Sequence, residues 1–581
     1  MACSKIFSGN LPELTSKIMQ NFQEDFSTLH SCILVSRSWC RLTIPLLWED
    51  PFYKYLPKNY YFIDIYLDKL NQDDKVKLNE YGIITDLFPS NTLFNYPNFI
   101  KCLNIQNTVS SIKNWIENSK ISSYDKDLKL SSFIFFSLIK VFIENEASLH
   151  TFEVQYIFNS DYFKSSFQLI LQNPNFICNV KDVKFDFRRL TSNLLSSLKC
   201  FYSNCKSISS LYIYSLIENY AEKDLFKIIN SQNNLKKICF DSEICNLKSL
   251  KNSNCSNTLK TIIFYGIDFE NLKFNLNEIF EQLNVLESIH ILYCSSPLNS
   301  TIIQQIVNLT KPFKLKSLFI DEFHATQIES LKLLLQKSGN YLENIGFELS
   351  MDHETDLQFI KLVKIYCNNI IFLDVFGYCD QNIFTSFDLI KNVQQNLNYL
   401  IINTQSKLSS IILQNLGQIL PYRLEYLSLD LKFSINDLEV LFKNTKNVFI
   451  RKLLIINRQE SEDILPCIKK YIMKEKRVAY LSVKVFFISN RVTTIKDLFY
   501  SKDEVEEFKF YNIQVTNHDV SRIQSFLIKL PKIIPEMESA YNFTEYRYRF
   551  LKEYQEPAKV GFSSLTSSSK SDFRKEEITG L

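Results

Sequence analysis

The residue types that carry most enzyme chemistry are present in this chain but scattered. None of the six histidines has a second ligand at metal-binding spacing. Asp321 with His324, and His353 between Asp352 and Glu354, could pair an acid with a base, but such groupings are common in solvated loops. There is no G-x-S-x-G, G-x-G-x-x-G or P-loop sequence. We therefore expect no enzyme activity, no catalytic residue, no cofactor and no metal.

The cysteines point to a reducing compartment rather than to thiol chemistry. The chain has 14 Cys but no C-x-x-C pair. No apolar run follows a basic N-terminal region, as it would in a signal peptide. No apolar run of about 18 residues is free of charge, as a membrane span requires. We expect free thiols in a cytoplasmic or nuclear protein that does not enter a membrane.

Composition indicates a large folded protein and gives no sign of a highly charged partner. The 581 residues exceed what one compact core holds, so several domains or a repeat architecture are expected. A net charge of +3 gives no reason to expect nucleic acid or anionic lipid. The basic run at 469–477 leaves RNA binding open as an alternative to a solvated helix face.

The segment 11–52 contains three short apolar-periodic runs and two of the three tryptophans. Pro12 suits a first helical position, and Leu14, Ile18 and Phe22 continue an apolar stripe. Asp25 or Ser27 can cap a second helix, and Ser36 a third. So small a unit either covers the next domain or exposes an apolar surface for a partner.

This segment resembles the F-box family. The resemblance rests on Leu11-Pro12, Leu14, Ile18, Val35, Arg37, Trp39 and Leu42, and on the trailing Pro45–Glu49, which is similar to the end of fungal F-box segments. Phe22 and Phe26 depart from the commoner Leu. The resemblance implies binding of the adaptor Skp1 and, through it, a cullin. It implies the following Skp1-binding residues: Leu11, Pro12, Leu14, Ile18, Phe22, Leu29, Val35, Trp39 and Leu42.

Behind this segment, the motif apolar-x-x-apolar-x-apolar recurs. From Ile208 to Leu424, nine copies begin 24 to 29 residues apart. Weaker copies begin at Ile450, Val478 and Val505, and upstream copies at Leu149, Val180 and Ile100. Helix-like runs lie between copies, so each unit is predicted to be a strand followed by a helix, stacked into one core.

The repeat resembles the leucine-rich repeat, which implies an α/β solenoid. That family usually places Asn or Cys three residues after the strand. Cys294 fits, but Ile267, Phe323 and others do not, so other groups are expected to replace the family's side-chain ladder.

In such a solenoid, alternate strand residues face the concave surface, where exposed aromatic and charged groups could contact an unknown target protein. The candidates for this surface are Tyr212, Tyr265, His290, Phe319, Asp321, Asp374 and Phe376.

The expected organisation has five parts: a flexible N-terminus (1–10), an F-box of three helices (11–52), an irregular connector (53–98), a leucine-rich-repeat-like solenoid (99–531) and a C-terminal segment (532–581), disordered from about 557. The resemblance implies a substrate-recognition adaptor of an SCF-type (Skp1–cullin–F-box) ubiquitin ligase. Two alternatives remain open. One is a non-ligase interaction scaffold whose N-terminal helices cap the solenoid, and the other is a divergent hydrolase or transferase.

Overall fold

The architecture was obtained from a computed structural model. It describes residues 12–22, 25–53, 60–118, 124–154, 164–186, 199–214, 219–241, 250–251, 254–270, 275–320, 323–348, 352–377, 382–404, 408–458, 463–489 and 492–517. The chain divides into two units at residue 521, and all described residues belong to the first. The expected flexible N-terminus and C-terminal segment lie outside the described residues.

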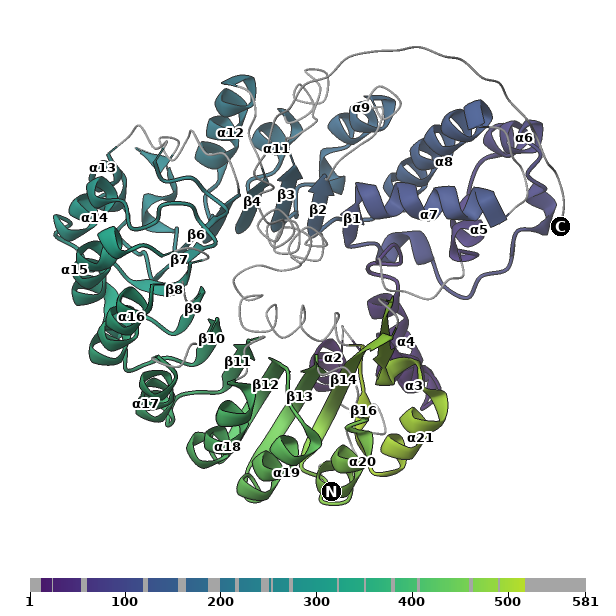
Figure 1. Ribbon diagram of the computed structural model, residues 1–581. Helices are drawn as coiled ribbons and strands as arrows, with labels where there is room; N and C mark the ends of the chain where they lie inside the picture. The colour runs from purple at the N-terminus through teal and green to yellow at the C-terminus, as the bar shows by residue number, and fades with distance from the viewer. Residues whose placement is uncertain are drawn as a thin grey trace, which may run out of the picture. The chain divides into compact units, whose positions relative to one another are not determined.

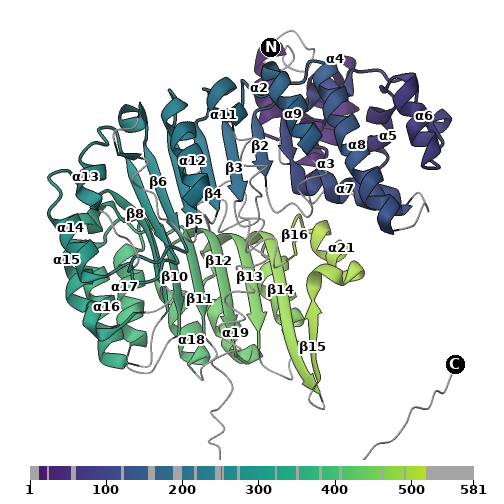
Figure 2. The same cartoon turned by 90° about the horizontal axis from the view of Figure 1, so that it is seen from above.

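A single sheet, parallel except at β15, organises the first unit, and its strands follow chain order from β1 to β15. Figure 1 shows this sheet curving with its helices on the outer side, and Figure 2 shows the strands side by side in the same order. The strands are β1 Cys102–Asn104, β2 Thr151–Val154, β3 Asp182–Asp186, β4 Ser210–Tyr214, β5 Lys237–Asp241, β6 Thr261–Tyr265, β7 Ser288–Leu292, β8 Leu315–Ile320, β9 Asn344–Glu348, β10 Phe372–Phe376, β11 Tyr399–Asn403, β12 Arg423–Leu431, β13 Phe449–Asn457, β14 Val478–Ser489, β15 Val492–Asp497 and β16 Gln514–Val515. The expected α/β fold is therefore confirmed, and the order of its strands and helices is compatible with the expected solenoid.

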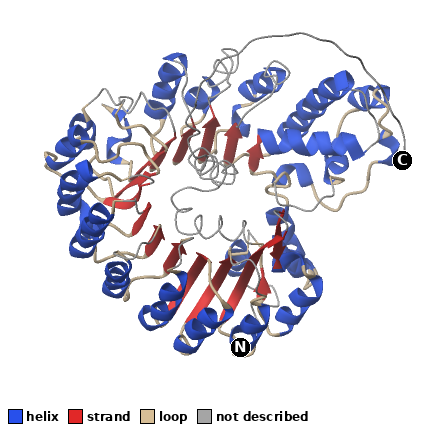
Figure 3. Cartoon of the chain, viewed as in Figure 1, coloured by secondary structure: helices blue, strands red, loops and turns tan. Residues whose placement is uncertain are grey.

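The outer layer consists of one helix or short helical turn between most consecutive strands (Figure 3). Apolar residues of each strand and helix join one continuous core, because a single repeat cannot bury both faces alone. These helices are α9 Lys164–Gln172, α11 Lys199–Asn204, α12 Asn219–Ser231, α13 Leu276–Phe280, α14 Ser300–Val307, α15 Ile328–Ser338, α16 His353–Tyr366, α17 Ile383–Val393, α18 Ser409–Ile419, α19 Ile435–Asn444 and α20 Leu465–Ile468.

The final strands close the sheet differently from the repeats. β15 pairs antiparallel with one half of β14, and the short β16 pairs parallel with the other half. The copy expected at Val505 is not a strand but lies in helix α21 (Lys502–Phe510). Its pattern V-E-E-F also fits a helix, because Val505 and Phe508 are three residues apart and Asp503 and Glu504 occupy the first turn.

The first strand follows a helical cap rather than an irregular connector. Helices α5 (Phe62–Leu67) and α6 (Gln72–Glu80) lie within 53–98, and α7 (Ile105–Asn118) and α8 (Tyr124–Glu144) follow β1. Tyr66 and Leu67 are fully buried in the main core. The expectation of an irregular connector was wrong, because Ile63, Tyr66 and Leu67 bury their side chains in the core and this part of the segment is helical.

The asparagine ladder missing after the strands is replaced at the other end of the repeat, where the helix leads into the next strand. Asn284 Nδ2 donates to Asn257 Oδ1 (2.7 Å), and Lys311 Nζ donates to Asn284 Oδ1 (3.1 Å). Later repeats continue it, with Asn369 Nδ2 donating to the Asn340 carbonyl (2.8 Å). Each bond links one repeat to the next, so backbone and side-chain groups of these turns are satisfied between neighbours. After the strands, Ile267 and Phe323 are instead buried in the core.

Candidate protein-interaction surfaces

The N-terminal unit is built from α2 (Pro12–Gln20), α3 (Phe26–Ile33) and α4 (Arg37–Leu47). Helix α2 begins at Pro12, as expected. Asp25 caps α3 by accepting from the Thr28 amide, and Ser36 caps α4 by accepting from the Trp39 amide (3.2 Å). Met19 and Leu29 are fully buried. The three helices expected here are therefore present.

One end of this unit is fixed to the solenoid cap. The Trp48 ring lies 4.1 Å from the Tyr96 ring and 5.6 Å from the Tyr66 ring, measured between centroids. Phe52 is buried against Phe142. The Glu49 carbonyl accepts from the Lys101 amide (2.9 Å), immediately before β1. Contacts of this kind hold the end of α4 onto the first strand and the cap helices.

The proposed Skp1-contacting side chains divide by exposure. Leu14 is 44% exposed and Val35 54%, and the neighbouring Leu34, which sequence reasoning did not single out, reaches 79%. Ile18, Phe22, Trp39 and Leu42 are half-buried. Leu29 faces the interior, so its assignment as a contact residue is contradicted by its burial. Pro12 lies in α2 but its side chain is not described, and Leu11 falls outside the described residues.

A ladder of alternate residues lines the inner face of the sheet. Its first row runs through paired positions of successive strands: Asn104, Glu153, Lys184, Tyr212, Cys239, Ile263, His290, Ser317, Asn344, Phe372, Tyr399, Tyr426, Lys452 and Tyr480. Neighbouring members are about 4.8 Å apart along the sheet. On a surface that curves inward, bulky side chains at this spacing pack against one another.

That packing buries several residues expected to be exposed to a target. Tyr212, His290, Phe319 and Asp374 are all buried, and Tyr265 is half-buried. The Phe319 ring lies 5.5 Å from the Tyr293 ring and 5.7 Å from the Phe372 ring. The prediction that these four side chains are free contact residues is therefore wrong. Phe376 lies in β10 without a described side chain, and Asp321 is outside the described residues.

Glycine at position 346 permits one of these contacts. It is the inner-face neighbour of Phe319 in β8 and of Asp374 in β10. A Cβ at 346 would overlap the Phe319 ring. The position of the Phe319 ring therefore requires glycine at 346, a role that the repeat pattern gives no sign of.

Polar members of the row are paired with one another. Lys184 Nζ lies 3.3 Å from Glu153 Oε2, and both side chains are almost fully buried. His290 Nδ1 lies 2.8 Å from Ser317 Oγ, which also accepts from Asn344 Nδ2 (2.9 Å). Burial, together with the charges of Lys237 and Lys316, lowers the pKa of His290 to about 3, so the ring is neutral at physiological pH.

The described residues give little support for metal binding or for a reactive thiol. Among the described residues, no group of three or more His, Cys, Asp or Glu side chains could hold a metal ion. Burial raises the pKa of the Cys367 thiol to about 12 and that of Cys467 to about 11, so both stay protonated at neutral pH. The basic run at 469–477 is partly neutralised, because Lys469 pairs with Glu507 (2.6 Å) and Lys470 with Glu439 (3.4 Å).

No protein-family model matches the chain, and no curated protein matches it. Within the described part of the chain, no helix has the length and apolar character needed to cross a membrane.

Proposed function

We propose that the chain is a substrate-recognition adaptor of an SCF-type ubiquitin ligase, in which the N-terminal helices bind a Skp1-like adaptor and the solenoid binds a target protein. It would catalyse no bond change itself. It would hold the target near the ubiquitin-charged enzyme, so its contribution is proximity and orientation.

The observation that carries the proposal is the exposure of Leu14, Leu34 and Val35 on a unit whose other end is packed onto the solenoid cap. Large apolar side chains left in water on so small a unit are a cost unless a partner covers them. The contacts of Trp48 and Phe52 fix the unit to the repeats, as an adaptor needs in order to hold its target in place.

Co-purification with Skp1 tests this function. We expect the wild-type chain to retain Skp1, and Leu14→Asp with Val35→Asp to lose it, because both charges enter an apolar interface while leaving the free protein folded. The matched control is Ile84→Asp with Leu87→Asp, since these side chains are 63% and 78% exposed in the cap. A wild-type chain that fails to retain Skp1, or a control that loses it equally, would contradict the proposal.

The second candidate is a scaffold outside any ligase, whose N-terminal helices only cap the solenoid. The docking of Trp48 and Phe52 favours it, because the same contacts would serve a cap. Absence of Skp1 from the wild-type complex, with a large loss of stability in Trp48→Ala, would support this candidate instead.

A further inference from the structure

The residues that immediately precede the first seven strands form a continuous row along one edge of the sheet, here called the rim row. Each backbone amide donates to the carbonyl of the member before it, at 2.7–2.8 Å. The rim row consists of Lys101, His150, Lys181, Ser209, Lys236, Lys260 and Glu287. These residues therefore lie side by side, one strand spacing of about 4.8 Å apart.

The first part of the rim row carries basic side chains that form no ion pair with an acidic side chain of the described residues. His150, Lys181 and Lys236 are exposed, Lys101 is half-buried, and Lys206 is exposed just before Ser209. Partial burial is the largest cause that lowers the pKa of His150. The charges of Lys101 and Lys181 lower this pKa further, and the charge of Asp182 raises it. The lowered pKa leaves the His150 ring largely neutral at neutral pH, so the positive charge of this part of the row comes from its lysines.

In later repeats, side chains of opposite charge occupy the same position. Lys260 Nζ pairs with Glu287 Oε1 (2.5 Å), and Arg451 pairs with Glu425 (3.3 Å) at the corresponding place in β12 and β13. Lys316 and Glu343 form another pair between repeats. Opposite charges there attract between neighbours, whereas no acidic residue occupies this position from β1 to β5.

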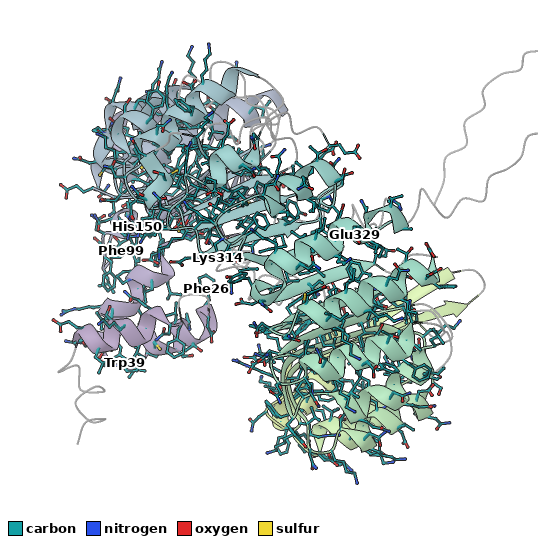
Figure 4. All side chains as sticks on the ribbon, turned by 90° about the vertical axis from the view of Figure 1, so that its left-hand side faces the viewer. Phe26, Trp39, Phe99, His150, Lys314 and Glu329 are labelled. Carbon is teal, nitrogen blue, oxygen red and sulfur yellow. The ribbon has the colours of Figure 1, made fainter. Side chains whose placement is uncertain are left out.

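We propose that the basic part of the rim row, from Lys101 to Lys236, binds an Asp/Glu-rich segment of a target polypeptide in an extended conformation. Four strand steps span about 19 Å, which an extended chain covers with about six residues. Its carboxylates would meet the unpaired lysine side chains, and its backbone would follow the edge of the sheet. His150 and Lys314, which marks the later part of this edge, are labelled in Figure 4.

A single-stranded nucleic acid is the less suitable anion. Such strands are usually held by platforms of aromatic side chains as well as by charge, and the rim row contains no Phe, Tyr or Trp, only the single ring of His150. The chain's net charge of only +3 supplies no wider field that would substitute for stacking. The inference rests on the proposed role of the solenoid in target binding but does not depend on Skp1.

The test uses the full chain and a fluorescein-labelled twelve-residue peptide that alternates Glu and Gly. Fluorescence anisotropy at low salt should show binding, and higher salt should weaken it. Lys101→Glu, Lys181→Glu and Lys236→Glu together should weaken it by about tenfold or more, since three attractions become repulsions. The triple Lys→Gln variant should give a smaller loss.

The matched control is Lys361→Glu, Lys391→Glu and Lys446→Glu, which changes net charge equally at exposed positions on the outer layer and its turns. It should change affinity by less than about twofold. The proposal is overturned if wild type does not bind the peptide, if both triple reversals weaken it equally, or if a twelve-nucleotide RNA binds this row more tightly. Peptide binding that persists in Leu14→Asp with Val35→Asp separates this result from failure of the Skp1 proposal.

Discussion

His290 shows how a residue type that suggests chemistry can serve packing instead. Its ring is 2% exposed and hydrogen-bonded to Ser317, between strands whose inner faces are closed by neighbouring side chains. A histidine among alternating apolar residues gives no sign of whether it points to water or to a crowded inner row. Sequence could place His290 on the inner face but not determine its burial, because burial depends on the sizes of neighbours in other repeats.

The pH dependence of stability should report this burial. The folded-state pKa of about 3 lies below the unfolded value of 6.5, so the unfolded chain binds the additional proton as pH falls. This contribution is complete above pH 6.5 and diminishes toward pH 3. Between pH 7.5 and 5, wild type should lose about 2 kcal/mol more free energy of unfolding than His290→Asn. Urea titrations at both pH values measure the difference, and equal losses would show that His290 is accessible to protons.

At the scale of elements, the repeat period predicted the strands well and its last copy badly. The copies beginning at Ile208 through Val478 all contain or immediately precede observed strands, as do the three upstream copies. The copy at Val505 failed because a short apolar pattern fits a helix as well as a strand. Helices α5 and α6 were missed because their burial depends on Phe142 and other residues distant in sequence.

The ladder between repeats predicts a specific stability effect. Asn284→Ala removes bonds to both Asn257 and Lys311, which belong to different repeats, and should lower the free energy of unfolding by about 1 kcal/mol. Asn308→Ala is the control, since among the described residues its side chain accepts only from Gln304 of helix α14. Its cost should stay below about 0.5 kcal/mol. Chemical denaturation of both variants decides whether hydrogen bonds between repeats contribute more to the free energy of unfolding than hydrogen bonds within one repeat.

For the described molecule as a whole, the N-terminal helices and the sheet differ in how much of their apolar surface is buried. Strands β4 to β12 are each paired on both sides and join the continuous core, whereas α2 exposes Leu14 and the turn between α3 and α4 exposes Leu34 and Val35. The sequence could predict both parts. It could not predict which apolar residues of α2–α4 remain exposed, because that depends on how α4 packs onto the cap.

Hydrogen exchange should reveal this difference. Amides of α2 and α3 should exchange at least about tenfold faster than those of β4–β12, because little buried surface opposes their opening. Addition of Skp1 should slow exchange in α2 and α3 without changing β4–β12. Mass spectrometry of peptic fragments measures both, and uniform exchange across the two regions would contradict the expectation.

The closing arrangement at β14 has a consequence for how such a chain can change in length. One edge of β14 is shared between antiparallel β15 and parallel β16, so no further strand–helix unit can pair there in the manner of the others. Duplication or deletion of a whole unit can be accommodated only between strands that accept parallel neighbours on both sides. We therefore expect repeats to be gained or lost in the interior of the array, away from the hairpin of β14 and β15.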